Sequence, residues 1–597
     1  MTDTSSSELI AETVSALPSS AAERFGAKVA ARYRSGDGWA EMSYEQVGQA
    51  VEEIALGLID LGLRPGDRVC LLANTRLEWT LCSFGISAAG GVVVPVYPTN
   101  SPGECRWVAG DSGARIAICE DEGQRRKFEQ VRDQLPELEH LIGIEAGAGE
   151  ISLQELRARG AGRDRAELAE RQAATRPEDP YTIVYTSGTT GPPKGTVLTH
   201  RNAMFVGLVA EELDFVTPEE TIYLYLPLAH VFALITMLAS FDQGTTLVFF
   251  GGDTKRILEE IVETRPTYVP SVPRIFEKIY AAAMKMQEQA SEEDRQRFRQ
   301  AIKLGVEVRL RRERGEEVPE EMRVPFEQAD EQIFQRVRQL FGGQLRLAVS
   351  GAAPIAAEIL EFFYAAGVPV MEGWGLTEST AVGTVGTPDA FKFGTVGRAV
   401  PGVEIRIAEE DGEILMRGPN IFKEYWNNPE ATAETLVDGW LHTGDLGQLD
   451  DEGFLTITGR KKDIIITAGG KNLTPANLEN DLKQSRFISQ AVMYGDRKPY
   501  PVALITLDPE EIIPWARERG LPEDLAQLAE EEQVRALIEQ EVERANSNYA
   551  QVEQIKKFRI LDHDLSIETG ELTPTLKVKR NVVYERYHDL LESMYGS

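Results

Sequence analysis

Tyr181-Thr-Ile-Val-Tyr-Thr-Ser-Gly-Thr-Thr-Gly-Pro-Pro-Lys-Gly195 joins a short apolar run to a loop of hydroxyls, glycines and one lysine. The β-branched and aromatic residues at 181–185 predict a buried strand. The glycines that follow permit backbone angles that turn amide N–H groups toward an anion, and Lys194 adds positive charge. The stretch therefore predicts a phosphate-binding loop, whereas the alternative is a plain connection between two elements. The candidate ligands are Thr186, Ser187, Gly188, Thr189, Thr190, Gly191 and Lys194.

Helical and strand-like patterns alternate on both sides of this loop. Apolar positions at helical spacing between 44 and 61 lead through a turn to a strand at 69–72, and a second such unit covers 77–97. After the loop, strand candidates recur at 223–228, 245–250, 268–270, 345–350 and 368–371. This order predicts an α/β fold with parallel sheet, in which the loop lies at the carboxyl end of a strand, where such sheets bind ligands.

The second half of the chain contains two stretches whose sequence pattern differs from the α/β alternation. A helical stretch rich in arginine and glutamate covers about 285–342, and we interpret its charges as solvated helix faces. From residue 394, short strands and tight turns predict a small β subdomain that ends near residue 460. We therefore expect a large N-terminal domain of residues 1–460, with the β subdomain at about 394–460, and a smaller mobile α+β domain of residues 461–597.

Composition narrows the possible functions. The 597 residues carry a net charge of −32, which disfavours nucleic acid as a partner. The first residues lack the pattern of a secretory signal, and the apolar run Val231–Phe241 is too short to span a bilayer. Four cysteines without Cys-x-x-Cys spacing are expected to be reduced thiols. We expect a cytoplasmic protein without a transmembrane segment; peripheral membrane contact and a homodimer both stay open.

Four further motifs accompany the loop at 181–195: Ser350-Gly-Ala-Ala-Pro354, Glu372-Gly-Trp-Gly-Leu-Thr-Glu-Ser379, Trp440-Leu-His-Thr-Gly-Asp445 and Glu571-Leu-Thr-Pro-Thr-Leu-Lys-Val-Lys-Arg580. In sequence and order the set resembles the signature motifs of adenylate-forming enzymes, the superfamily of acyl-CoA synthetases, luciferases and peptide-synthetase adenylation domains. Leu576 stands where these enzymes usually have a glycine. In this position the chain resembles the longer-chain branch of the acyl-CoA synthetases, which shows the same departure.

The resemblance implies roles for individual residues. Thr377 is expected near a phosphate and Glu378 as the Mg²⁺ ligand, since Mg²⁺ commonly uses one or two protein carboxylates. Asp445 is expected to bind the ribose hydroxyls, and Lys577 to be the catalytic lysine. The resemblance also implies that His230 lies near the acyl carbonyl. The other expected nucleotide or cofactor contacts are Gly351, Ala352, Gly373, Trp374, Gly375, Arg460, Lys462, Gly469 and Lys471, with Lys462 at the hinge between the domains.

The function that the resemblance implies is a long-chain fatty acid:CoA ligase, which uses ATP, Mg²⁺ and CoA. Each buried methylene contributes about 0.8 kcal/mol, so we expect broad acceptance of saturated acids of about twelve to eighteen carbons. Several alternatives share the fold. They are a ligase for medium-chain or aryl acids, a fatty acyl-AMP ligase, luciferase chemistry and a catalytically inactive nucleotide-binding module.

Overall fold

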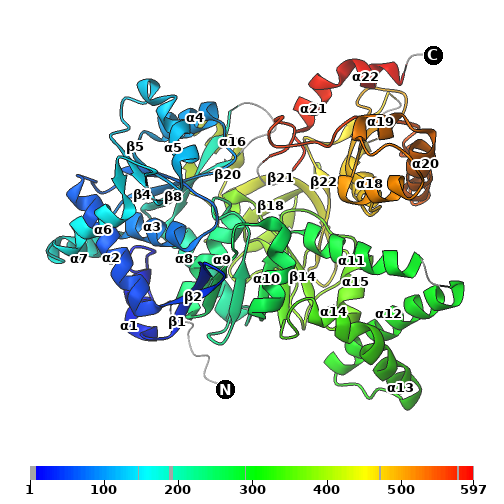
Figure 1. Cartoon of the computed structure of the whole chain (residues 1–597), viewed down its shortest axis with the longest axis horizontal. Helices are drawn as coiled ribbons and strands as arrows, with labels where there is room; N and C mark the ends of the chain where they lie inside the picture. The colour runs from blue at the N-terminus through cyan, green and yellow to red at the C-terminus, as the bar shows by residue number, and fades with distance from the viewer. Residues whose placement is uncertain are drawn as a thin grey trace.

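The computed structural model describes residues 9–145, 147–186, 192–288, 291–468, 472–573 and 577–595. Figure 1 shows two adjoining α/β lobes, a small β sheet beside them and a C-terminal domain that lies against the second lobe. This arrangement confirms the predicted class, a mixed α/β protein with a large N-terminal domain and a smaller C-terminal one.

The first lobe contains an eight-stranded sheet in the order β19-β9-β8-β4-β3-β5-β6-β7. Strands from β8 to β7 run parallel, as the helix and strand alternation predicts, whereas β9 pairs antiparallel with β8. The predicted phosphate loop thus joins the two strands of a hairpin. The strands are β3 (Arg68–Leu72), β4 (Val92–Val96), β5 (Ala114–Cys119), β6 (His140–Gly143), β7 (Ile151–Ser152), β8 (Pro180–Thr186), β9 (Lys194–Thr199) and β19 (Glu424–Tyr425).

The second lobe contains a nine-stranded sheet in the order β16-β15-β14-β13-β12-β10-β11-β1-β2, parallel from β14 to β1. The predicted strand at 223–228 lies earlier in the structure, at Thr221–Leu224, and Pro227 falls in the turn that follows it. The strands are β1 (Val29–Ser35), β2 (Gly38–Ser43), β10 (Thr221–Leu224), β11 (Thr246–Phe249), β12 (Tyr268–Ser271), β13 (Leu347–Ser350), β14 (Val370–Trp374), β15 (Thr384–Val385) and β16 (Arg398–Ala399).

Four helices pack in one core cluster with both sheets: α2 (Tyr44–Asp60), α3 (Leu77–Ala88), α8 (His200–Glu212) and α9 (Val231–Gln243). Helix α9 is buried on nearly every side, which explains why its sequence is apolar without an amphipathic stripe. No helix in the described ranges combines the length and apolarity that crossing a membrane requires. The other helices of this lobe pair are α1 (Leu17–Phe25), α4 (Pro102–Ser112), α5 (Glu122–Glu129), α6 (Leu153–Ala161), α7 (Ala166–Ala174), α10 (Ile257–Thr264) and α15 (Ala357–Ala366).

Helix α11 (Pro273–Glu288) leads into the charged stretch at about 285–342, which forms α12 (Glu292–Glu313), α13 (Glu320–Ala329) and α14 (Gln335–Gln339). Helices α12 and α13 project as an arm (Figure 1). The charged faces are exposed, as predicted, but one side of α12 is not solvated. Phe298 and Val308 are buried in a cluster with α15, and Gly305 approaches Ala365 so closely that a Cβ would lie 2.8 Å from it.

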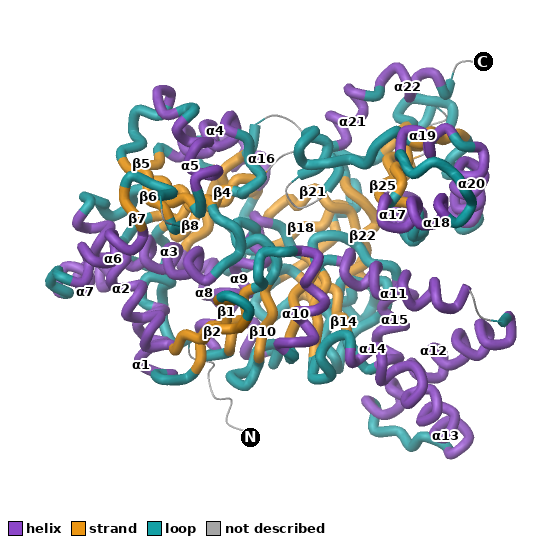
Figure 2. The backbone as a smooth tube through the Cα atoms, in the orientation of Figure 1, coloured by secondary structure: helices purple, strands orange, loops and turns teal. Residues whose placement is uncertain are grey.

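The small β subdomain is a five-stranded sheet in the order β17-β18-β21-β20, and β22 pairs with β21 along the same edge as β20, farther along the strand. Its strands are β17 (Glu404–Ile407), β18 (Glu413–Arg417), β20 (Leu436–Val437), β21 (Trp440–Leu449) and β22 (Leu455–Arg460). Two segments of the predicted range lie elsewhere, since β16 completes the nine-stranded sheet and β19 joins the eight-stranded one. Helix α16 (Pro429–Thr435) follows β19. The chain therefore links all three sheets between residues 394 and 460 (Figure 2).

The C-terminal domain contains a two-stranded sheet and a three-stranded sheet covered by helices. Its strands are β23 (Ile465–Ile466), β24 (Asn472–Leu473), β25 (Ile488–Tyr494), β26 (Val502–Leu507) and β27 (Lys557–Ile560). Its helices are α17 (Pro475–Lys483), α18 (Pro509–Arg517), α19 (Leu525–Glu530), α20 (Glu532–Asn546), α21 (Arg580–Arg586) and α22 (His588–Ser593). Ion pairs join α18 to α11, with Arg274 to Asp508 at 2.6 Å and Lys278 to Glu510 at 2.7 Å.

Candidate active site

A cavity of about 770 Å³ lies where the two lobes, the small sheet and the C-terminal domain meet. It opens at the carboxyl ends of β8, β13 and β14, the position that a parallel sheet favours for ligands. Of the residues proposed from the sequence, the cavity is lined by Thr186, Lys194, His230, Gly351, Ala352, Gly373, Gly375, Thr377, Glu378, Arg460, Lys462 and Lys577. Ser187, Gly188, Thr189, Thr190, Gly191, Gly469 and Lys471 lie outside the described residues.

Glu378 follows β14 on a single 3₁₀ turn, Thr377–Ser379, and faces the cavity. Its Oε1 accepts a hydrogen bond of 2.6 Å from the hydroxyl of Tyr425, and its backbone oxygen accepts one of 2.8 Å from the N–H of Phe422. Lys194 lies over the ring of Tyr425, 4.8 Å from the ring centre. The acidic side chain of Glu378 and the basic side chain of Lys194 therefore both line the cavity, each from a different element.

The backbone around this site is unusual. Ala352, Thr380 and Ala381 have φ values of 69°, 53° and 60°, a region that residues with a Cβ seldom occupy. A Cβ on Gly375 would lie 2.4 Å from the backbone of Ala381, so only glycine permits the two segments to approach this closely. Strain of this kind gathers at functional sites and keeps the polar groups of tight loops in fixed positions.

Lys577 reaches the cavity from the C-terminal domain. Its backbone N–H donates to Oγ1 of Thr573 at 3.0 Å, and Thr573 donates back to its carbonyl at 2.8 Å. Although water in the cavity can reach the side chain, the enclosing walls and the charge of Arg460 lower the pKa of Lys577 to about 8, against the opposing effect of Asp445 and Glu378. The ammonium is therefore a cation that can lose its proton near neutral pH.

His230 caps the N-terminus of α9, where its Nδ1 accepts a hydrogen bond of 3.3 Å from the N–H of Phe232. Burial lowers the pKa of His230 to about 3, and nearby Lys577 acts in the same direction. The imidazole is thus neutral at physiological pH, with Nδ1 as the acceptor and Nε2 as the donor. It serves both as a helix cap and as part of the cavity wall.

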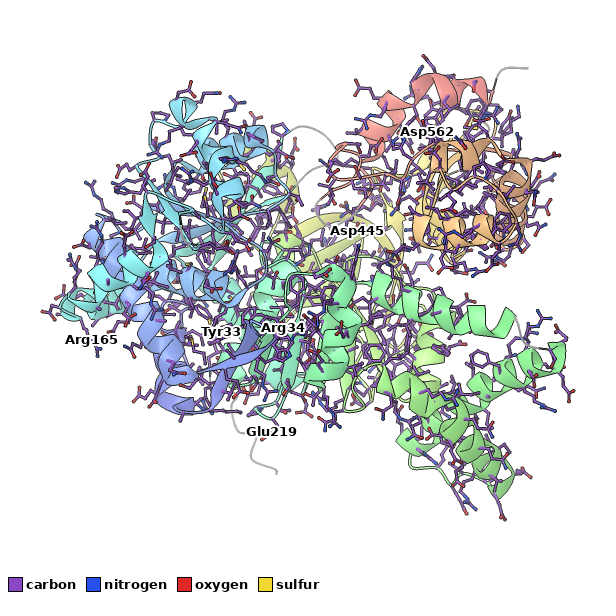
Figure 3. The ribbon with its side chains drawn as sticks, viewed as in Figure 1. Tyr33, Arg34, Arg165, Glu219, Asp445 and Asp562 are labelled. Carbon is purple, nitrogen blue, oxygen red and sulfur yellow. The ribbon has the colours of Figure 1, made fainter. Side chains whose placement is uncertain are left out.

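Asp445 lies on β21 beside the C-terminal domain, where Figure 3 labels it. Its Oδ1 accepts from Nε of Arg460 at 2.7 Å, and its Oδ2 accepts from Nε1 of Trp374 at 2.9 Å. Asp445 and Trp374 are not among the residues that line the cavity, whereas Arg460 is. Each carboxylate oxygen keeps a second lone pair, so Asp445 can accept hydroxyl protons besides its present donors.

The predicted hinge follows directly on β22. Lys461 is held from two sides, because its ammonium contacts Asp411 at 2.6 Å and Glu413 at 3.2 Å and its N–H donates to the oxygen of Gly444. Lys462, the next residue, is exposed at the mouth of the cavity. The last residue fixed to the small sheet is therefore the one before the predicted pivot.

Part of the cavity is an apolar arm between α8 and α9. Its walls are Val206, Val209, Ala210, Phe215, Val216, Val231, Phe232, Ile235, Thr236 and Ala239. From His230 to Ala239 the helix rises about 13 Å, at about 1.5 Å per residue. Polar groups thus surround one end of the cavity and hydrocarbon side chains surround the other.

Tyr425 and Glu413 belong to this site although the sequence motifs did not single them out. Tyr425 lies on the two-residue strand β19, and nothing in its sequence neighbours indicates a contact with Glu378. Glu413, 5% exposed, stands at the start of β18, where Lys461, His442 and the N–H of Gly444 all contact its carboxylate. Both contacts are tertiary, so local pattern carries no signal of them.

Comparison with known proteins agrees with this geometry. The family described as AMP-binding enzyme matches residues 19–426, and the AMP-binding enzyme C-terminal domain matches residues 462–597. The long-chain-fatty-acid–CoA ligase FadD15 of Mycobacterium bovis is 41% identical over 563 residues, covering 94% of this chain and 93% of the relative. The long-chain-fatty-acid–CoA ligase ACSBG2 of Xenopus laevis is 33% identical and covers 96% and 82%.

Solved structures share the fold. The anthranilate CoA ligase AuaEII in complex with anthranoyl-AMP has a TM-score of 0.73 at 22% identity, covering 96% of this chain and 97% of that one. The adenylation domain of a carboxylate reductase from Mycobacterium chelonae has a TM-score of 0.79 at 20% identity and covers 98% and 91%. Since the family matches span most of the sequence, this chain belongs to the AMP-binding, adenylate-forming enzyme family.

Proposed function

We propose that this protein is a long-chain fatty acid:CoA ligase. It activates a fatty acid with ATP to acyl-AMP and pyrophosphate, and then transfers the acyl group to CoA with release of AMP. The observation that carries the proposal is one cavity in which Lys577, Glu378 and Lys194 surround a polar end while an apolar arm extends between α8 and α9. The identity of 41% with a long-chain-fatty-acid–CoA ligase over nearly the whole chain supports it.

In the first step the substrate carboxylate attacks the α-phosphorus of ATP, and pyrophosphate leaves. The site needs no protein nucleophile, only groups that align the reactants and stabilise the charge on the phosphoryl oxygens. Lys577 supplies a cation between carboxylate and α-phosphate, and neutral His230 offers its Nε2 proton near the acyl carbonyl. Asp445 accepts the ribose hydroxyl protons, and Arg460, already paired with it, faces the nucleotide.

Magnesium fits the residues present. Glu378 offers one carboxylate to the cavity, and within the described ranges no group of three or more His, Cys, Asp or Glu forms a cage for a metal. One carboxylate suits Mg²⁺, which takes most of its ligands from phosphate oxygens and water. When bound, the ion neutralises charge on the phosphates during displacement.

In the second step the sulfur of CoA attacks the acyl carbonyl and the thiol proton is lost. The bond between the acyl carbon and the phosphate oxygen breaks, and AMP leaves. The C-terminal domain rotates about Lys462 between the steps and withdraws Lys577 from the site. The ion pairs of Arg274 and Lys278 with α18 hold the adenylating arrangement and must break for this rotation. With this hinge, the N-terminal domain ends at residue 460 and the C-terminal domain begins at residue 461.

The adenylation rate should fall in alkaline solution. The pKa of Lys577 is about 8, so the ammonium is present below that value and is lost as the pH rises through it. We expect kcat/KM for pyrophosphate release, which reports the free enzyme, to fall about tenfold per pH unit above this pKa. Lys577→Arg should remove the alkaline limb, because guanidinium stays charged. If kcat/KM of the arginine variant still falls at alkaline pH, a group other than Lys577 causes the fall.

A bulky side chain at residue 239 should shorten the accepted acyl chain. An extended chain advances roughly 1.25 Å per methylene, so about ten methylenes reach from His230 to Ala239 and a longer chain continues past it. Ala239→Phe should block the arm at this depth and lower kcat/KM for palmitate by at least about 100-fold, since several methylenes worth about 0.8 kcal/mol each lose their contacts. Octanoate should be used almost as before, and this retained activity shows that the variant is folded. An equal loss with both acids would place the chain elsewhere.

The test of the function is AMP formation with CoA across acids from acetate to stearate and benzoate. The expected outcome is broad activity from about twelve to eighteen carbons. A sharp optimum at acetate or benzoate excludes the long-chain assignment. Absence of acyl-CoA despite pyrophosphate release identifies a fatty acyl-AMP ligase, absence of both identifies an inactive binding module, and light output identifies a luciferase.

Other expectations stay predictions. A cytoplasmic location is supported by four cysteines that are all unpaired and buried, as expected of a reducing compartment. Peripheral membrane contact and a homodimer likewise stay predictions.

A further inference from the structure

Tyr425 makes contacts that the proposed reaction does not itself require. The residue belongs to β19, a two-residue strand that leaves the small sheet and pairs with β9 in the register Tyr425 to Thr196 and Glu424 to Val197. Its side chain is 6% exposed. The phenol hydroxyl donates to Oε1 of Glu378, and the N–H of Phe422 in the same segment donates to the backbone oxygen of Glu378. One segment thus holds both the main chain and the side chain of Glu378.

The same ring also contacts a basic residue. Lys194 begins β9 directly after the predicted phosphate loop, and its ammonium lies 4.8 Å from the centre of the Tyr425 ring. A cation over an aromatic face is attracted by the negative face of the ring. Tyr425 therefore touches the acidic group and one basic group of the polar end of the cavity, although they belong to different lobes.

We propose that Tyr425 is a positioning residue that fixes the Glu378 carboxylate for the metal–ATP complex and Lys194 for the phosphates. This inference rests on the proposed function. The hydroxyl occupies Oε1, whereas Oε2 accepts no hydrogen bond from the described residues and stays available to the cavity. Loss of a hydrogen bond that orients a metal-binding group typically weakens the metal site 10- to 100-fold.

The experiment measures metal binding without turnover. Purified full-length protein in excess over ATP, without fatty acid, is titrated with Mn²⁺, and free Mn²⁺ is followed by electron paramagnetic resonance. A protein-free titration of the same ATP gives the Mn²⁺ that ATP binds alone and is subtracted. Tyr425→Phe keeps the ring under Lys194 and removes only the hydroxyl, so its Mn²⁺ dissociation constant should rise about tenfold or more. Its affinity for ATP in EDTA should equal that of the wild type. Tyr425→Leu removes the ring as well and should weaken ATP binding in EDTA too.

Tyr223→Phe is the matched control. Tyr223 is fully buried and donates to Oε2 of Glu260 at 2.8 Å, but it does not line the cavity. It should leave the Mn²⁺ dissociation constant unchanged, and thermal unfolding of both variants reports their folding. An unchanged constant in Tyr425→Phe, or an equal rise in Tyr223→Phe, overturns the positioning role. Wild-type protein that binds no Mn²⁺ with ATP overturns the proposed function instead, which separates the two failures.

Discussion

Lys577→Ala should abolish most acyl-AMP formation and spare the thioester step. In the closed arrangement the ammonium lines the cavity near Arg460 and Glu378, where it can bridge the attacking carboxylate and the α-phosphate. Removing one preorganised electrostatic group from a transition state typically lowers the rate about 10²- to 10³-fold. Pyrophosphate release from palmitate and ATP should fall by this factor, whereas the conversion of supplied palmitoyl-AMP and CoA to palmitoyl-CoA should change little.

Two further variants test this split. Lys579→Ala removes a cation two residues away, outside the cavity lining, and should leave acyl-AMP formation unchanged. Lys462→Pro fixes φ at the predicted hinge and should hinder the thioester step while adenylation continues. If Lys577→Ala slows neither half-reaction beyond a few fold, the lysine is one more exposed cation, and the rotation argument built on it fails.

Glu378→Ala should depress adenylation and its reversal together by at least about 100-fold, because the metal–phosphate interaction contributes several kcal/mol to the displacement. The residue lies on a short turn with its side chain toward the cavity, so folding should be nearly unaffected. The rate of pyrophosphate exchange into ATP, measured against Mg²⁺ concentration, checks this expectation. Wild-type and variant curves with the same Mg²⁺ midpoint would refute the assignment.

Glu372→Gln is the control for charge. Glu372 stands on β14, the strand that precedes the turn of Glu378, but outside the lining of the cavity. Burial raises its pKa to about 8, so this carboxyl is mostly protonated at neutral pH and resembles the amide that replaces it. The substitution should leave the Mg²⁺ dependence unchanged. A common defect in Glu372→Gln and Glu378→Ala would indicate damage to the loop rather than loss of a metal ligand.

Local sequence patterns and motifs were sufficient to predict the class of fold and the family. Apolar runs with helical or strand spacing, separated by glycine and proline turns, predicted the helix at 44–61, the strands β3, β4 and β8 and the small β subdomain. These patterns are local, because helix and strand periods and turn residues depend on neighbours along the chain. The motifs from 181 to 580 placed Lys194, Thr377, Glu378 and Lys577 in one candidate site before any contact was known.

Tertiary structure alone decided which side chains share that site and how they are held. The apolar run at 231–241 became a helix buried between other elements, and Phe298, Gly305 and Val308 turned one side of a charged helix toward α15. Tyr425 reached Glu378 only because β19 crosses to the sheet of the other lobe. Docking of sheets and domains brings residues distant in sequence within hydrogen-bond reach, and no local period records which distant surface each element will meet.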